Sequence, residues 1–404
     1  MSERLAERIR ALPGMDALLP ALRGLPPAFL VGGTVRDLLR GERAVDIDVA
    51  VEGDATAAAR DVALRTGGDV IVHERFGTAT VRAAGVVADL ATTRRELYEQ
   101  PGALPVVEPA TLDEDLARRD FSVNAMAVEL SGDRLGHLRD PHGGRADLDS
   151  GVVRVLHDRS FVDDPTRLLR AVRYEARLGA RMDPDTEALA REAVADRALD
   201  TVSAHRIRDE LVDLLAEVEV GRAVERLADL ELDRALHPAL AADPELVASV
   251  ALACLETGAD RALAVLAALV SADPDALAAW LETLGLRRSD RERVLAGARQ
   301  APGLVAPLRA ELPPSAVHAL LRCEPPETLA LALALGAPAG PVLRFLADLR
   351  DVHLEITGDD LIAAGLERSP AIGRALDEVL RRKLDGEVSG REAELRLALE
   401  VARS

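Results

Sequence analysis

The feature that most constrains the fold of this chain is the stretch at positions 29–53, which reads FLVGGTVRDLLRGERAVDIDVAVEG. An apolar run with strand character ends in Gly32 and Gly33, and a short helical segment that carries Arg36 follows. Glycines directly before a helix let backbone N–H groups approach a phosphate closely. The stretch therefore predicts a strand, a tight turn and a helix that together can cradle a phosphate.

A second strand-like run in the same stretch carries Asp46 and Asp48. Because strand side chains alternate, these two carboxylates share one face, whereas Ile47 and Val49 point to the opposite face and into a core. Two stacked carboxylates repel each other in water, and Mg²⁺ relieves this because it takes carboxylate oxygens together with substrate phosphates. We therefore interpret Asp46 and Asp48 as magnesium ligands of a phosphoryl- or nucleotidyl-transfer site.

Each half of this pattern also has a purely structural explanation. A glycine pair after a strand is usually a turn, and Asp-x-Asp on a strand is often a solvated edge. Their combination is more specific, and it resembles the first motif of class II tRNA nucleotidyltransferases and bacterial poly(A) polymerases, L-V-G-G-x-V-R-D-x-L-L-G followed by D-x-D. The resemblance implies an Mg²⁺-dependent enzyme with Asp46 and Asp48 as catalytic metal ligands and with Gly32, Gly33 and Arg36 beside the nucleotide.

The composition limits the kind of RNA surface that the chain can have. The 404 residues are 48% hydrophobic but only 2% aromatic, which argues against an aromatic platform for stacking bases. The formal net charge of −19 opposes binding of nucleic acid over the whole surface. An RNA-binding surface must therefore be a local basic patch.

The sequence predicts a cytoplasmic protein without a membrane partner. Positions 1–14 form an amphipathic helix with acidic residues rather than the apolar region of a signal peptide. No uncharged span reaches the roughly 18 residues that a transmembrane helix requires.

The order of β-rich and helical segments predicts an α+β protein, with a nucleotidyltransferase-type catalytic head built on a small mixed β-sheet and an all-α remainder. We expect the head at 1–155, a neck with nucleotide-base recognition at 156–218, a body at 219–305, and a tail at 306–404 that binds tRNA. Positions 92–113 are rich in Pro and Gly, and we interpret them as a mobile lid with little regular structure.

A third acidic residue, Asp89, lies in the apolar strand-like run at positions 86–91. It is either a charge on an edge strand or a third carboxylate beside Asp46 and Asp48, which helps to bind metal or accepts the proton of the attacking hydroxyl. The resembled family has an acidic residue here, followed by Ala-Thr-x-Arg as in this chain, and this implies a catalytic role for Asp89.

The segment at positions 115–126, DLARRDFSVNAM, gathers polar groups around apolar ones. Asp120 and Asn124 are four residues apart and share one face if the segment is helical. The segment resembles the family motif R-R-D-F-[ST]-x-N-A-M. The resemblance implies that Arg119, Asp120 and Asn124 lie near the sugar and phosphates of a bound nucleotide.

Positions 160–180 predict a helix whose arginines form a stripe along one face. These arginines are Arg167, Arg170, Arg173 and Arg177. This concentration of positive charge requires an anionic partner or neighbouring acidic residues. Asp164 before Pro165 has the spacing of a helix N-cap followed by proline at the first helical position.

The same segment resembles the family's E-D-x-x-R element, in which Asp and Arg form a protein template for the base edge of CTP or ATP. This implies that Asp164 and Arg167 read the base and that Arg170 faces the triphosphate. A carboxylate accepts from a base amino group and a guanidinium donates to ring nitrogen and carbonyl, so the pair suits cytosine and adenine. Asp163 stands where the family usually has Glu, which shortens the reach of that carboxylate.

The resemblance therefore implies a template-independent enzyme that adds nucleotides from CTP and ATP to the 3′ end of tRNA and makes or repairs the CCA end. A-adding, CC-adding and poly(A) polymerase activities stay open, because these enzymes share nearly the same head. The alternative from a different class is a non-catalytic RNA-binding protein on the same fold. That alternative predicts loss of the metal carboxylates, and both Asp46 and Asp48 are present.

Overall fold

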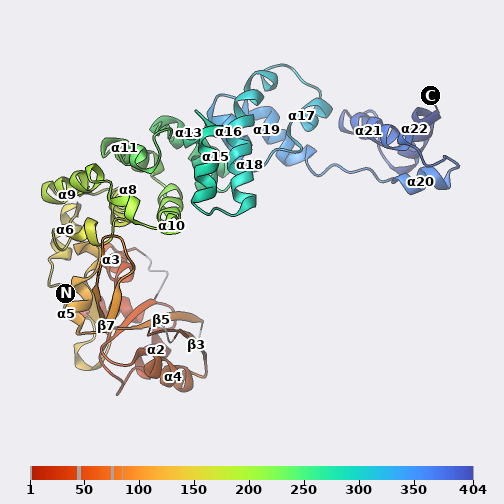
Figure 1. Cartoon of the computed structure of the whole chain (residues 1–404). Helices are drawn as coiled ribbons and strands as arrows, with labels where there is room; N and C mark the ends of the chain where they lie inside the picture. The colour runs from red at the N-terminus through yellow and green to blue at the C-terminus, as the bar shows by residue number, and fades with distance from the viewer. Residues whose placement is uncertain (1, 43–46, 74–76, 84, 404) are drawn as a thin grey trace. The chain divides into compact units, whose positions relative to one another are not determined.

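The computed structural model describes residues 2–42, 47–73, 77–83 and 85–403, and it divides into two compact units, Met1–Glu210 and Leu211–Ser404 (Figure 1). The first unit combines β-sheet with helices, and every element described beyond Leu211 is helical. The predicted α+β class, with the β-sheet in the N-terminal part, is confirmed.

A seven-stranded mixed sheet forms the centre of the first unit, in the order β3-β4-β5-β2-β1-β8-β9. The strands are β1 (Ala28–Val31), β2 (Ile47–Val51), β3 (Asp69–His73), β4 (Thr78–Ala83), β5 (Val86–Thr92), β8 (Ala127–Glu129) and β9 (Leu138–Arg139). Strands β2 and β5 are parallel, and the other neighbouring pairs are antiparallel. Residues in register on β2 and β5 therefore point to the same face of the sheet.

One face of the sheet is closed by an apolar core. Ile47 and Val49 are buried in it, as the alternation along the strand predicts, together with residues of α1 (Ser2–Arg10), α2 (Met15–Ala21) and α4 (Ala55–Thr66). Full burial of an aliphatic side chain of this size stabilises a fold by about 1.5–3 kcal/mol. This core fixes the register of β2, because a slip by one residue would turn its apolar side chains to the other face.

The opposite face of the sheet carries a smaller apolar cluster, through which Phe29 and Ala50 pack against α5 (Leu112–Ala117). Beside this cluster the face opens into a cavity that Asp48 and Asp89 line. The two faces of β2 thus differ in function, since one packs into the apolar core and the other presents the Asp48 carboxylate to the cavity.

The prediction that positions 92–113 lack regular structure is wrong. Strands β6 (Arg94–Leu97) and β7 (Val106–Pro109) pair as an antiparallel ribbon, and α5 begins at Leu112. The ribbon carries a cross-strand ion pair of 2.7 Å between Arg95 and Glu108. Most of the Pro and Gly residues that suggested a loop lie in the connection between the two strands, which leaves the strand segments free to pair.

The predicted helix at positions 160–180 is interrupted. Helix α7 (Ser160–Asp163) ends before Pro165, and α8 (Arg167–Leu178) begins after it. Proline disfavours the helical conformation of the preceding residue, and Asp164 is extended, with φ −135° and ψ 92°. The remaining helices of this unit are α3 (Gly33–Arg40), α6 (Gly144–Ser150) and α9 (Pro184–Ala195), and α10 (Ala204–Leu215) begins in it.

The second unit is a succession of helices. The α-helices that begin in this unit are α11 (Val220–Asp229), α12 (Leu232–Leu236), α13 (Pro244–Thr257), α14 (Arg261–Leu269), α15 (Pro274–Thr283), α16 (Arg288–Leu308), α17 (Pro314–Leu321), α18 (Pro326–Ala334), α19 (Ala339–Arg344), α20 (Gly358–Ala363), α21 (Pro370–Leu384) and α22 (Arg391–Arg403), and a π-helical segment, Phe345–Leu349, follows α19. Helix α14 is apolar on all sides and is buried among α13, α16 and α18. Within the part of the chain that the structure describes, no helix is both long and apolar enough to cross a membrane.

Candidate active site

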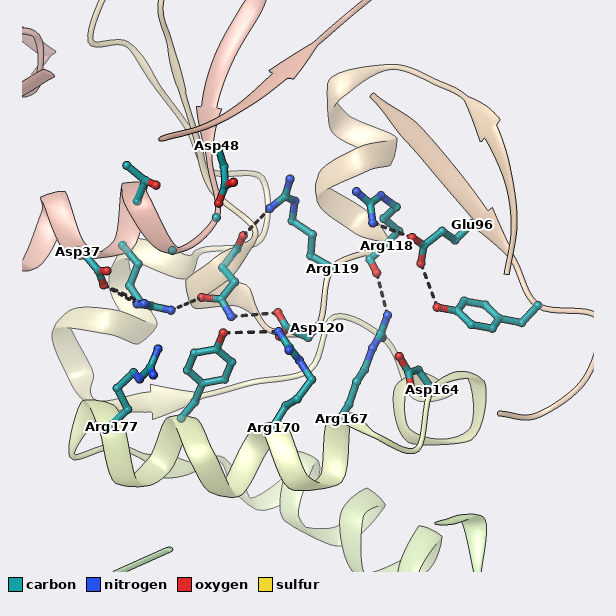
Figure 2. Close-up of a pocket in the computed structure, with 17 residues that line it drawn as sticks. Asp37, Asp48, Glu96, Arg118, Arg119, Asp120, Asp164, Arg167, Arg170 and Arg177 are labelled. Atoms are coloured by element: carbon teal, nitrogen blue, oxygen red, sulfur yellow. Dashed lines mark hydrogen bonds and ion pairs between the residues drawn. The ribbon is translucent and has the colours of Figure 1, made fainter. Parts of the chain in front are cut away.

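A cavity of about 620 Å³ lies where the glycine turn after β1, the segment after α5 and helix α8 come together (Figure 2). It brings together ten of the twelve residues that the sequence predicts for the site, which are Gly32, Gly33, Arg36, Asp48, Arg119, Asp120, Asn124, Asp164, Arg167 and Arg170. Asp89 lines an adjoining cavity of about 450 Å³ that shares Asp48 with the first. Asp46 lies outside the described residues.

The glycine turn at the head of α3 is required by its backbone and by its neighbour. Gly32 has φ +66° and ψ −135°, a conformation that side chains other than glycine rarely adopt. A Cβ atom on Gly32 would lie 3.1 Å from Nη1 of Arg119. The turn therefore leaves room for the Arg119 guanidinium directly above the N-terminus of α3, where an anion is favoured.

The carboxylates of Asp48 and Asp89 lie on the open face of the sheet. Asp48 on β2 is in register with Asp89 on β5, so the two side chains are neighbours on one face. Strand β5 lies between β4 and β2, which rules out the edge-strand explanation for Asp89. The Oγ1 atom of Thr80 on β4 donates to Oδ1 of Asp89 at 2.5 Å. These positions offer oxygen ligands of the kind that Mg²⁺ prefers.

No group of three potential metal ligands is found among the described residues, a set that does not include Asp46. Asp46 is two residues before Asp48 in the sequence and is the other half of the predicted Asp-x-Asp pair.

Asp120 is the centre of a buried hydrogen-bond network. Its Oδ1 accepts from the backbone N–H of Phe121 at 2.8 Å and from Nδ2 of Asn124 at 3.0 Å. Its Oδ2 accepts from Nε and Nη2 of Arg170 at 3.0 and 2.6 Å. Burial acts to raise the pKa of Asp120, but the charge of Arg170 and these hydrogen bonds outweigh burial and lower that pKa.

The pairing of Asp120 with Asn124 arises from a turn rather than from the predicted helical spacing. Helix α5 ends at Ala117, and residues Ser122–Asn124 form a single 3₁₀ turn. Asn124 then accepts from Nη1 of Arg36 through its Oδ1 at 2.8 Å. Asn124 therefore links the helix after the glycine turn to Asp120.

Helix α8 supplies the floor of the cavity. The ring of Tyr174 lies beneath three guanidinium groups, those of Arg36, Arg170 and Arg173, at 5.3, 5.7 and 5.7 Å from the ring centroid. Such cation–π contacts favour a positive environment over the ring. The floor is thus electropositive although the whole chain carries a net negative charge.

Neighbouring acidic residues account for part of the arginine stripe on α8. Arg170 also pairs with Glu210 at 2.9 Å, and Arg173 pairs with Glu210 at 3.4 Å. Burial opposes the charged form of Arg170, but Asp120 and the other negative groups nearby raise its pKa above the usual value. Arg177 is exposed at the end of the stripe and lines the cavity.

Asp164 and Arg167 lie at the other end of the cavity. Asp164 does not cap α8 as predicted, since Thr166 is the residue that precedes the helix. Its Oδ1 accepts from N and Oγ1 of Thr166 at 3.1 and 2.6 Å and from Nη2 of Arg206 at 2.8 Å. The buried Arg167 donates from Nη1 to Ser160 Oγ at 2.7 Å and from Nη2 to the carbonyl of Arg118 at 2.8 Å.

Sequence reasoning assigned no place in the site to several residues that line the cavity, among them Glu96, Tyr98 and Arg118. Glu96 and Tyr98 belong to the ribbon region that was interpreted as an irregular lid. Arg118 lies in the segment at positions 115–126, whose two arginines could hold triphosphate, but only Arg119 was assigned to the site. The signal that could have found Arg118 is the spacing of Asp115 to Arg118 and Arg119, at three and four residues, which lets one carboxylate reach both guanidinium groups.

Two family models match the chain. One, described as the poly A polymerase head domain, matches residues 28–154, and the other, described as the probable RNA and SrmB-binding site of polymerase A, matches residues 179–243. The first match contains the glycine turn, Asp48 and the Arg119–Asn124 segment.

Curated relatives cover most of the chain. The chain is 37% identical over 401 residues to the A-adding tRNA nucleotidyltransferase of Geobacter sulfurreducens, and this match covers 94% of this chain and 45% of that protein. The chain is also 35% identical over 368 residues to the CC-adding tRNA nucleotidyltransferase of Deinococcus radiodurans, and this match covers 90% of this chain and 87% of that protein. The chain spans less than half the length of the A-adding relatives that it matches.

A solved structure described as the complex of a CCA-adding enzyme with CTP is similar over the whole chain. The TM-score is 0.79 with 31% sequence identity, and the match covers 100% of this chain and 98% of that one. The similarity thus extends beyond the head into the helical part of the chain.

Proposed function

The chain belongs to the family defined by the poly A polymerase head domain, and on that premise we propose that it is a tRNA nucleotidyltransferase. It transfers CMP and AMP from CTP and ATP to the 3′ end of tRNA without a template and releases pyrophosphate. The names of the A-adding and CC-adding relatives support this reaction class.

The observation that carries the proposal is a single cavity with two chemically different ends. The turn at Gly32 and Gly33 and the guanidinium of Arg119 suit phosphate groups, whereas Asp164 and Arg167 offer an acceptor and a donor to a base edge. Figure 2 shows Asp48 beside Arg119 and far from Asp164. A nucleoside triphosphate has the same two ends.

We propose that Asp46 and Asp48 hold two Mg²⁺ ions, because Asp48 presents a carboxylate next to that of Asp89 on the open face of the sheet. Bound Mg²⁺ supplies charge stabilisation on the phosphate oxygens and orients the reacting groups. Asp89 accepts the proton of the attacking 3′-hydroxyl, directly or through water. Arg119 neutralises charge on the leaving pyrophosphate.

The base is read by Asp164 and Arg167 in this proposal. Because Oδ1 of Asp164 already accepts three hydrogen bonds, we assign Oδ2 to the amino group of cytosine or adenine. Guanine and uracil present a carbonyl at that position, and a carbonyl facing a carboxylate leaves both groups without a donor. Asp120, Asn124, Arg36 and Arg170 hold the sugar and phosphate side, since their network fixes the wall of the cavity there.

We further propose that the chain is organised as a head at 1–155, a neck at 156–218, a body at 219–305 and a tail at 306–404, and that body and tail bind the tRNA. The similarity over the full chain to a solved structure described as a CCA-adding enzyme with CTP supports this assignment.

A split activity is the second candidate, and a specific observation favours it. The curated relatives that match most of this chain are A-adding and CC-adding enzymes. Poly(A) polymerase activity would use the same head. A non-catalytic RNA-binding role is disfavoured because Asp48 is retained and lines the cavity.

The test is extension of three tRNA substrates, ending before CCA, after the first C and after CC, with CTP and ATP supplied singly and together in Mg²⁺. Completion of all three ends supports CCA addition. Addition of A alone to the CC end, or of two C residues alone, identifies one half of a split pair, and long A tails identify a poly(A) polymerase. Failure to extend any RNA overturns the proposal.

A further inference from the structure

The carboxylate of Asp115, which does not line the nucleotide cavity, pairs with two arginines that do, Arg118 and Arg119. Asp115 on α5 is only 2% exposed, and it pairs through Oδ2 with Nη2 of Arg119 at 3.0 Å. Its Oδ1 accepts from Nε of Arg118 at 3.0 Å and from the backbone N–H of Arg94 at 3.2 Å. One buried carboxylate therefore anchors two neighbouring guanidinium groups and the first residue of β6.

The charge of Asp115 is stabilised by these partners. Burial acts to raise its pKa, but the charges of Arg119 and Arg118 outweigh burial and lower that pKa. A buried carboxylate persists only when it is paired and hydrogen-bonded. Asp115 therefore stays ionised and exerts its hold on both arginines at neutral pH.

The two arginines lead to different parts of the cavity. Arg119 lies against the turn at Gly32, which we assign to phosphate. Arg118 turns the other way and donates from Nη1 to Oε1 of Glu96 at 2.7 Å (Figure 2). The two neighbours in sequence thus serve opposite sides of the site.

The second branch ends on an aromatic ring. Oε2 of Glu96 accepts from the hydroxyl of Tyr98 at 2.9 Å, and Tyr98 lines the cavity together with Asp164 and Arg167. Burial and the negative charge of Glu96 raise the pKa of Tyr98, so its hydroxyl remains a donor to Glu96. The chain Asp115–Arg118–Glu96–Tyr98 therefore fixes a ring at the end of the cavity that we assign to the base.

We propose that Asp115 is a positioning residue that sets both ends of the nucleotide site, the phosphate end through Arg119 and the base end through Arg118, Glu96 and Tyr98. The proposal rests on the proposed nucleotide transfer and extends it to residues that do not contact the reacting atoms. Tyr98 forms a wall against which either base packs, since every base offers an aromatic face.

The two branches predict different losses in binding. Removing the charge of Asp115 frees both arginines, so the affinities for inorganic tripolyphosphate and for a nucleoside fall together. Removing the charge of Glu96, or the hydroxyl of Tyr98, affects only the base end. We expect Asp115→Asn to raise both dissociation constants about tenfold, the size of a lost charge-assisted contact.

The experiment measures the affinity of the full chain for tripolyphosphate, cytidine and adenosine by calorimetry. The variants are Asp115→Asn, Glu96→Gln and Tyr98→Phe. Asp113→Asn is the matched control, because Asp113 lies on the same helix α5 but is exposed and pairs with Arg139 at the surface. We expect a double loss for Asp115→Asn, nucleoside loss alone for Glu96→Gln and Tyr98→Phe, and no loss for Asp113→Asn.

Thermal unfolding of each variant shows whether the fold is kept, and Asp115→Glu provides a second variant that retains the charge if Asp115→Asn does not fold. Unchanged binding of both probes by a folded Asp115→Asn protein overturns the inference. Loss of nucleoside binding without loss of tripolyphosphate binding overturns the branch through Arg119. Because binding is read without turnover, a wild-type protein that binds nucleotides but extends no RNA refutes the proposed function and leaves this inference standing.

Discussion

Two buried carboxylates, Asp120 in the first unit and Glu327 in the second, solve the same electrostatic problem with different results. Asp120 accepts two hydrogen bonds from Arg170, one from Asn124 and one from a backbone N–H. Glu327, which is 0% exposed, accepts from Nε and Nη2 of Arg293 at 3.0 and 2.5 Å and from the backbone N–H of Asp260 at 2.9 Å. Each carboxylate is paired, as a buried charge must be.

The difference lies in what surrounds the pair. Asp120 and Arg170 line a cavity, and Arg170 continues to Glu210 and to the ring of Tyr174. Glu327 instead ties the start of α14 to α16 and α18 inside a packed helical core. A buried carboxylate–arginine pair thus forms part of a site where packing leaves a cavity. Where packing is complete, the same kind of pair holds helices together, and we call such a pair a structural lock.

The largest effect is expected where the cavity meets the open face of the sheet. Asp48→Asn removes a charge that we assign to metal binding, and it should lower the rate of nucleotide addition about 10³-fold or more, while the fold is retained. Primer extension with the CC-ending tRNA measures the rate. Asp61→Asn, an exposed carboxylate on α4, is the control. A rate within tenfold of the wild type would show that Asp48 has no metal to hold.

The second largest effect is expected on the stability of the fold, and it distinguishes the structural role of Glu327 from the role of Asp120 in the cavity. Glu327→Ala removes the buried partner of Arg293 and leaves it only the weaker pair with Asp290 at 3.7 Å. Because Arg293 is 36% exposed, water offsets part of the loss, so we expect about 2–4 kcal/mol of destabilisation. Urea denaturation measures the change. Asp275→Ala, which breaks an exposed pair with Arg299, should change little. Equal losses in the two variants would contradict the assignment of Glu327 as a lock.

The third prediction concerns acid pH. The pKa of Asp120 is lowered in the folded state, so its contribution is complete above the unfolded value near 3.8 and is lost as the pH falls below it. Wild-type protein should therefore lose more stability between pH 5 and pH 2 than Asp120→Asn. Denaturation curves across that range test this. Parallel pH profiles of the two proteins would refute it.

A smaller effect is expected at the connection between β6 and β7. Gly102 has φ +70° and is buried, and a Cβ atom there would lie 2.2 Å from Oγ1 of Thr201. Gly102→Ala should raise proteolysis in the connection and cost about 1–2 kcal/mol of local stability. Gly132→Ala shares the positive φ but meets nothing within 4 Å, so it isolates the strain from the clash. Equal susceptibility of the two variants to proteolysis in the connection would mean that Gly102 does not pack closely against Thr201.

The smallest effect is expected at the surface of α21. Glu378 pairs with Arg381 and Arg382 at 2.8 Å each, and its hydrogen bonds to these arginines lower its pKa to about 2. Solvent and salt screen such pairs, so Glu378→Gln should lower the melting temperature by less than about 2 °C. Repeating the measurement at high salt should remove even this difference. A larger shift would place Glu378 among the structural locks.

The local pattern was sufficient for the elements around the sheet. The alternation of Ile47 and Val49 with Asp48 predicted which side chains enter the core. The ribbon of β6 and β7 was missed because its turn residues resemble those of a loop. The break before α8 was missed because one helix was predicted over positions 160–180, although Pro165 disfavours the helical conformation of Asp164.

The sequence by itself determined the family, the α+β class and ten of the residues that line the cavity, because these are carried by short motifs with fixed spacing. Only the tertiary structure decided how their charges are shared. Asp115, Glu96 and Tyr98 become part of the site because a ribbon returns to the cavity and a helix end turns two arginines in opposite directions. Spacing along the chain cannot encode such contacts, since hydrogen bonds between distant segments form only when packing brings the partners together.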